Sequence, residues 1–247
     1  MKKILFVCPY PMNVAAGQRL KFEPHFSDLE KHGYEITVHS FMNEKLWKIA
    51  SSKGHTFKKI FWTFHGLIRR LILIFSLKKY DYTYIFMNVF PFGPPIIESI
   101  YVKLSKKVIF DIEDNILSQE VGSINKIASI LKSTSKARYL IINAHRVITS
   151  SPDLVDKCNK ISNKNSAIFI PPTLEEERFI SKSDNNSNKH RIVIGWTGTF
   201  SSREFLNIVT PELEKLYKKI KFKFMVIGNF KMENPNLDLE VLQWNSK

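Results

Sequence analysis

The fold class is indicated by the stretch from Arg191 to Leu206, which reads RIVIGWTGTFSSREFL. Its apolar run Ile192 to Ile194 is typical of a buried parallel strand, and Gly195 and Gly198 predict a tight turn after it. A serine pair follows the turn and predicts the start of a helix from Arg203 to Lys219. A strand, a glycine turn and a helix N-terminus together present backbone N–H groups that suit a phosphate.

Upstream of this stretch, short apolar runs alternate with helical segments. Strands are predicted at 3–8, 35–41, 81–88, 107–112, 146–150 and 167–170, and helices at 19–32, 57–77, 96–104, 123–144 and 152–160. Six strands that alternate with helices specify an α/β fold with a doubly wound parallel sheet. Further strands are predicted at 223–227 and 237–242, so a second unit of the same type is expected to begin after the first.

The domain boundaries follow from composition. Residues 1–173 are expected to form the first domain, 174–190 a linker that contains SDNNSN, and 191–247 part of a second domain. The last range holds 57 residues, whereas a typical domain has about 100–150. The second domain is therefore expected to be incomplete in this chain.

The chain is basic, with 37 Lys and Arg against 23 Asp and Glu and a formal net charge of +14. This charge favours a polyanion, an anionic membrane or a phosphorylated substrate, although lysine that is abundant throughout explains it equally well. No RNA-recognition or zinc-finger motif accompanies it, so no nucleic-acid partner is expected. Two distant cysteines and an N-terminal apolar run that stops at Pro9 predict a cytoplasmic protein without a disulfide or signal peptide.

The segment 57–79 is both apolar and basic and reads FKKIFWTFHGLIRRLILIFSLKK. Arg69 and Arg70 near its middle disfavour a membrane span by roughly 2.5–3.5 kcal/mol each. A helix with Phe64 and Phe75 on one side and basic residues at its flanks is typical of an interfacial helix on an anionic membrane. The alternative is an ordinary helix packed on the sheet, with its arginines at the rim.

Two loops of the first domain are candidate ligand sites, because ligands bind outside the carboxyl ends of parallel strands. In the loop Asn13 to Arg19, Gly17 allows close backbone approach and Arg19 could meet an anion. A plain strand-to-helix turn is the alternative. Near the end of the predicted strand 107–112, a cluster of carboxylates could orient hydroxyl groups or act as a base, or could simply cap and solvate a helix. These are Asp111, Glu113 and Asp114.

Several other chemistries are not supported. A nicotinamide-binding domain would carry GxGxxG after the first strand and an acidic residue after the second. Here the first loop carries prolines and the second strand ends His39-Ser40-Phe41. No histidine has a partner at metal-ligand spacing, and no Walker A loop, GxSxG or HExxH motif is present.

Taken together, these motifs resemble the GT-B glycosyltransferases, and within them the family 4-like retaining enzymes of bacterial surface-polysaccharide assembly. The resembling segments are KILFVCPYP with AAGQR, LEKHGYEITVHSF, FDIEDNIL, VITSSPDLVDKC with IFIPPT, and IVIGWTGTFSSREFL with FMVIGNF. The resemblance implies two facing Rossmann-like domains, an acceptor in the first, a nucleotide-diphosphate sugar in the second, and transfer without a metal or other cofactor.

Site residues are carried over from the resemblance by matching motifs. Donor-binding residues would be Gly195, Gly198, Thr199, Phe200 and Arg203. Asp111 and Asp114 would be the catalytic candidates that face the cleft. The acceptor-side residues would be Gly17, Gln18, Arg19 and Glu113.

The function expected from the resemblance is transfer of a sugar to a lipid-linked or polysaccharide acceptor at the cytoplasmic face of a membrane. The family's later pair of glutamates, which grip the donor, has no counterpart in these 247 residues. The alternative expectation is therefore a non-catalytic binding module, or pseudoenzyme, of the same fold.

Overall fold

The computed structural model describes residues 1–50, 52–113, 134–174, 192–198 and 202–243. The chain divides into two compact units, Met1–Ile180 and Ser181–Lys247. The division falls inside the range 174–190 that composition marks as a linker. Each unit is described by itself.

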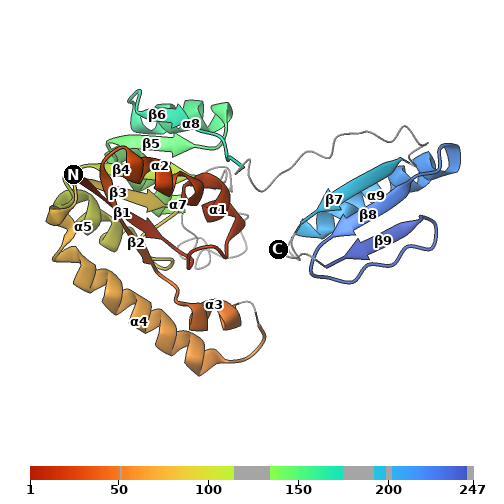
Figure 1. Cartoon of the computed structure of the whole chain (residues 1–247), viewed down its shortest axis with the longest axis horizontal. Helices are drawn as coiled ribbons and strands as arrows, with labels where there is room; N and C mark the ends of the chain where they lie inside the picture. Colours follow the sequence, from red (N-terminus) through yellow and green to blue (C-terminus); the bar gives the residue numbers. More distant parts are fainter. Residues whose placement is uncertain (51, 114–133, 175–191, 199–201, 244–247) are drawn as a thin grey trace. The chain divides into compact units, whose positions relative to one another are not determined.

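The first unit is built on a six-stranded parallel sheet in the order β2-β1-β3-β4-β5-β6 (Figure 1). The strands are β1 (Lys2–Cys8), β2 (Tyr34–Ser40), β3 (Tyr82–Phe86), β4 (Val108–Ile112), β5 (Arg146–Thr149) and β6 (Ala167–Phe169). All six lie where the apolar runs predict them, and the doubly wound parallel sheet is confirmed. The strand order reverses between β1 and β3, which is where sheets of this kind bind ligands.

Helices cover both faces of this sheet because successive strand residues point to opposite faces. On one face, α1 (Ala16–Lys21), η1 (Glu23–His25) and α2 (Phe26–Lys31) bring Phe22 and Phe26 against Phe6. The other face packs against four longer helices and the short η2 (Leu77–Lys79). These are α4 (Thr56–Ile74), α5 (Ile96–Leu104), α7 (Thr134–Asn143) and α8 (Pro152–Ser162).

Two helical predictions differ from the structure. The helix expected at 19–32 is three short pieces, because Pro24 has no backbone N–H and sits at the start of η1. A short helix, α3 (Glu44–Ala50), was not predicted; the side chain of Asn43 accepts a hydrogen bond from the backbone N–H of Leu46 at its start. The helix expected at 123–144 is described only from Thr134 onward.

The second unit contains a three-stranded parallel sheet in the order β7-β8-β9. Its strands are β7 (Val193–Thr197), β8 (Lys223–Ile227) and β9 (Leu239–Leu242), and α9 (Glu204–Lys219) follows β7. The core of the unit is formed by Leu206, Phe222, Phe224, Val226, Phe230 and Leu237. Within the described residues of either unit, no helix is both long enough and apolar enough to cross a membrane.

Candidate functional site

The candidate site of the first unit is the edge at which its parallel strands end, here called the carboxyl edge. The last strand residues there are Cys8, Ser40, Phe86, Ile112, Thr149 and Phe169. Ends of neighbouring parallel strands meet at one edge, so the loops that follow them lie together. Three sets of buried polar side chains hold these loops in place.

The first set is the guanidinium of Arg70, which lies in the interior although it belongs to the long apolar helix α4. Its Nη2 donates to the carbonyl of Cys8 at 2.7 Å, and its Nε donates to the carbonyl of Val89 at 3.0 Å. Its Nη1 lies 2.7 Å from both the carbonyl oxygen and the ring Nδ1 of His39. One side chain therefore ties together the ends of β1 and β2 and the loop after β3.

The ionisation states at this contact follow from burial. Burial lowers the pKa of Arg70 to about 10, so the guanidinium stays charged at neutral pH. Burial, followed by the charge of Arg70, lowers the pKa of His39 to about 3. His39 is thus neutral, and its Nδ1 accepts the hydrogen bond from Arg70. A neutral, occupied imidazole is not available to hold a phosphate.

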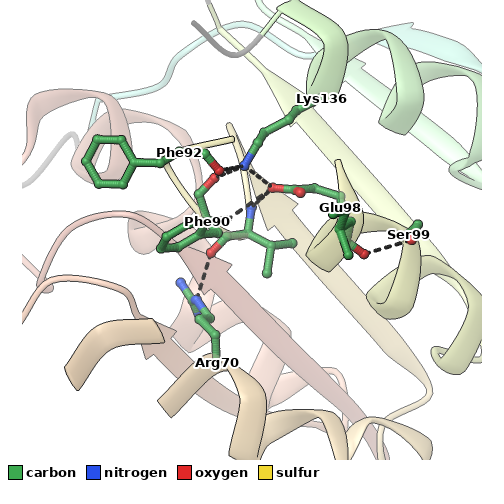
Figure 2. Close-up of polar contacts among 8 residues, drawn as sticks. Arg70, Phe90, Phe92, Glu98, Ser99 and Lys136 are labelled. Atoms are coloured by element: carbon green, nitrogen blue, oxygen red, sulfur yellow. Dashed lines mark hydrogen bonds and ion pairs between the residues drawn. The ribbon is translucent and has the colours of Figure 1, made fainter. Parts of the chain in front are cut away.

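The second set fixes the loop 87–95 after β3 (Figure 2). Glu98 accepts hydrogen bonds from the backbone N–H groups of Val89 at 3.3 Å and Phe90 at 3.2 Å. Lys136 donates to the carbonyls of Phe90 and Phe92, the latter at 2.7 Å, and its Nζ lies 3.2 Å from Glu98. Both charged side chains are buried, so they compensate one another. Glu98 and Lys136 therefore fix the backbone of the loop 87–95, which lies next to the point where the strand order reverses.

The third set shapes the loop after β1. Gln18 is fully buried; its Oε1 accepts from the backbone N–H of Tyr10 at 3.0 Å. Its Nε2 donates to the carbonyl of Tyr10 and to Glu23, both at 3.1 Å. Both ends of the amide are engaged within the loop. The predicted acceptor-side residue Gln18 thus stabilises the loop after β1, and its amide is not available to bind a ligand.

The neighbouring Gly17 touches one of the predicted carboxylates. A Cβ at Gly17 would lie 2.3 Å from Oε2 of Glu113, which follows β4. The backbone carbonyl of Glu113 also accepts a hydrogen bond from the hydroxyl of Ser150, just after β5. Two of the predicted acceptor-side residues, far apart in sequence, are thus in contact at the carboxyl edge. Arg19, two residues further along α1, has interactions of its own.

Asp111, one of the predicted catalytic residues, is enclosed by other residues of the first unit. It is the last-but-one residue of β4, and its fully buried carboxylate points beneath α1. Its Oδ2 accepts a hydrogen bond from the hydroxyl of Tyr84, and its Oδ1 lies 3.5 Å from Nζ of Lys21. Lys21 also donates to the carbonyl of Ile170 at 2.6 Å. These contacts join α1, β4 and the segment after β6.

Asp111 borders a cavity of about 250 Å³ between α1, α2 and the sheet. The cavity is otherwise lined mainly by apolar side chains, among them Phe6, Phe22 and Ile109. This surrounding raises the pKa of Asp111 to about 6, while the charge of Lys21 and the hydrogen bond from Tyr84 oppose the shift. A carboxylate in this position can fix α1 to the sheet; reaching a substrate at the carboxyl edge would require it to turn outward.

In the second unit, Gly198, which follows β7, has no room for a side chain. A Cβ at Gly198 would lie 2.4 Å from the ring of Trp196 and 2.6 Å from Oγ of Ser202. A Cβ at Gly228, after β8, would lie 2.9 Å from the carbonyl oxygen of Gly198. The N–H of Gly198 donates to the carbonyl of Ile227 at 3.1 Å. The ends of two neighbouring strands thus meet as bare backbone.

The remaining predicted residues are placed as follows. Gly195 lies within β7 with open space where a Cβ would be. Arg203 precedes α9, and its guanidinium lies 5.7 Å from the ring centroid of Phe230. Asp114, Thr199 and Phe200 lie outside the described residues. Within the residues that are described, no group of His, Cys, Asp and Glu could hold a metal ion.

Comparison with known proteins adds little to this geometry. No family model and no curated protein matches the chain. Among solved structures, it is similar to the crystal structure of the glycosyltransferase SnogD from Streptomyces nogalater, with 12% sequence identity and a TM-score of 0.45. The alignment covers 99% of this chain and 73% of the other. A likeness this distant carries no conclusion about activity.

Replacing Arg70 by Met tests the role of its guanidinium. We expect the free energy of unfolding to fall by about 3 kcal/mol or more, because three carbonyl oxygens and an imidazole lose a buried donor. The matched control is Arg69→Met, the adjacent arginine that is only half-buried, with an expected change within about 0.5 kcal/mol. Urea unfolding measures both, and equal losses would contradict the assignment.

Replacing Asp111 by Asn tests its buried ionisation. A folded-state pKa of about 6, above the ordinary 3.8, makes a stabilising contribution that is complete below pH 3.8 and is lost as the pH rises through 6. Relative to the variant, the native protein should therefore lose on the order of 2 kcal/mol between these limits. Urea unfolding at several pH values gives this difference.

The exposed Asp153→Asn change on α8 is the control for that experiment, and it should leave the pH dependence of the native protein unchanged. A pH profile that Asp111→Asn does not alter would show that Asp111 ionises normally.

Proposed function

We propose that this chain is a glycosyltransferase of GT-B type, with the acceptor at the carboxyl edge of the first unit and a nucleotide-diphosphate sugar on the second. The observation that carries the proposal is the close approach of Gly198, after β7, to Gly228, after β8. At Gly198 and Gly228, two strand ends meet as bare backbone, and α9 begins six residues after the first glycine. Backbone N–H groups ahead of a helix suit a diphosphate.

The proposed chemistry needs the diphosphate to leave as an anion. Backbone N–H groups at the turn and the cation of Arg203 would stabilise the charge that grows on it. Gly195, Thr199 and Phe200 complete the proposed donor side. Arg203 suits this role because it directly precedes α9 and its guanidinium lies 5.7 Å from the ring centroid of Phe230.

On the acceptor side, Glu113 is the carboxylate best placed to orient a hydroxyl group. It contacts Gly17 at the carboxyl edge. Asp114 remains a proposed catalytic residue because it follows directly in sequence. Asp111 enters the proposal as a positioning residue, since its carboxylate holds Lys21 and Tyr84.

The finer parts of the proposal come from the resemblance of the motifs. They are a family 4-like retaining mechanism, no metal or other cofactor, and a lipid-linked or polysaccharide acceptor in cell-surface glycan biosynthesis. An anionic membrane surface in contact with residues 57–79 would present a lipid-linked acceptor to the first unit. Nucleic acid has no part in the proposal.

The donor site is tested by calorimetric titration of the full chain with nucleotide-diphosphate sugars. Arg203→Gln should weaken binding by about 10- to 100-fold, the value of a charge-assisted hydrogen bond. Lys219→Gln, at the far end of α9, is the matched control and should bind as the native chain does. Gly198 is a poor target, because a Cβ there lies 2.4 Å from Trp196 and would disturb the turn.

Release of nucleoside diphosphate in the presence of a glycan acceptor then measures turnover. Donor binding that depends on Arg203, without turnover with any acceptor, would favour the non-catalytic binding module. No binding of any nucleotide sugar would contradict the proposal as a whole.

A further inference from the structure

The helix α4 packs on the first unit through a narrow inner seam. The seam consists of Gly66, Arg70 and Leu73, all buried and spaced by four and three residues. A Cβ at Gly66 would lie 2.9 Å from both the ring and the carbonyl oxygen of Phe41, so the helix approaches that residue as closely as a glycine allows. Together with the hydrogen bonds of Arg70, this contact fixes the rotation of α4 about its own axis.

The opposite side of the helix carries an apolar stripe in solvent, here called the outer stripe. Its members are spaced 4-3-4-3-4 and are Phe57, Phe61, Phe64, Ile68, Leu71 and Phe75. Their exposed fractions run from 40% at Leu71 to 90% at Phe57 and Phe75. At about 100° per residue, this stripe lies on the side away from the inner seam. A contiguous row of exposed phenylalanines is characteristic of an interaction surface.

The charged residues in the sequence around the outer stripe are all basic. From Lys45 to Tyr80 the sequence contains nine lysines and arginines and no aspartate or glutamate. Lys58 and Arg69 lie eleven residues apart, close to three helical turns, and therefore share one flank of the stripe. An apolar stripe beside a cationic flank complements a surface that is apolar inside and anionic outside.

A groove continues the apolar surface from the other flank of α4 towards the carboxyl edge. It has a volume of about 390 Å³ and is lined by Lys59, Ile60, Thr63, Phe64, Leu67, Phe90 and Phe92. Phe64 belongs to both the outer stripe and the groove. Phe90 and Phe92 belong to the loop that Glu98 and Lys136 hold at the end of β3 (Figure 2). The apolar surface thus reaches from α4 to the candidate acceptor site.

We propose that the outer stripe of α4 inserts into the surface of a bilayer that contains anionic phospholipid. The stripe enters between the acyl chains, while Lys58 and Arg69 lie at the level of the phosphates. A second copy of this chain is the other occupant that a 4-3 spacing suits. It would place the cationic flanks of two helices together without an acidic partner, so the bilayer is the better match. The inference extends the proposed function, because docking brings the carboxyl edge to lipid headgroups.

Flotation of the full chain with vesicles tests this inference without any sugar nucleotide. We expect it to bind vesicles of phosphatidylcholine mixed with phosphatidylglycerol, and to bind pure phosphatidylcholine much more weakly. The double change Phe61→Ser and Phe64→Ser should weaken binding by about a hundredfold, since roughly tenfold is lost for each phenylalanine kept in water. Lys58→Gln and Arg69→Gln should each weaken binding to the anionic vesicles by about fivefold.

The controls are matched to these changes. Ile96→Ser removes an apolar side chain that is 62% exposed on α5, and Lys103→Gln removes an exposed cation from the same helix. Both should bind anionic vesicles as the native chain does. Circular dichroism and urea unfolding verify that each variant is folded.

Three results would overturn the inference. The first is no binding to anionic vesicles at low salt, and the second is an equal loss of binding in the stripe and control variants. The third is a dimer in sedimentation equilibrium that the two stripe changes dissociate, which would assign the stripe to a second copy. Because donor titration is independent of vesicles, failure here leaves the transferase proposal standing, and failure of donor binding leaves membrane docking standing.

Discussion

The buried guanidinium of Arg70 is the contact on which the carboxyl edge depends. Parallel strands end in carbonyl groups that have no partner in the next strand, and buried carbonyls need donors. Arg70 supplies them at the ends of β1 and β2 and in the loop after β3. It can do so because α4 packs closely on the first unit at Gly66, which touches Phe41. The position of α4 therefore determines the shape of the carboxyl edge.

That constraint also explains why the outer stripe stays in solvent. Because the guanidinium of Arg70 is hydrogen-bonded in the interior, α4 cannot rotate about its axis to bring the phenylalanines of the outer stripe towards the core. The same helix thus organises the candidate acceptor site on one side and offers an apolar, cationic surface on the other. In the second unit the corresponding constraint is the close approach of Gly198 and Gly228 after β7 and β8, which leaves no room for a Cβ at either residue.

The sheet was predictable from sequence because apolar runs of a few residues bounded by Pro and Gly leave few alternatives to buried strands. Contacts between distant residues were not. Arg70 disfavours a membrane span, but the expectation that it lies at the rim of a packed helix is wrong. Its spacing from Gly66 and Leu73 places it on the buried inner side of α4. The contact between Gly17 and Glu113 needs the strand order, and the inward turn of Asp111 needs the burial of β4. The break in the helix at Pro24 is signalled by the sequence, because proline has no backbone N–H.

The central claim, that the second unit holds a nucleoside diphosphate, is tested most directly by nuclear magnetic resonance of the isotopically labelled full chain. Titration with a set of nucleoside diphosphates should shift the backbone amide signals of Gly198, Ser202, Arg203 and Gly228, and leave those at the carboxyl edge of the first unit largely in place. Shifts confined to the first unit, or none with any nucleotide, would contradict the account.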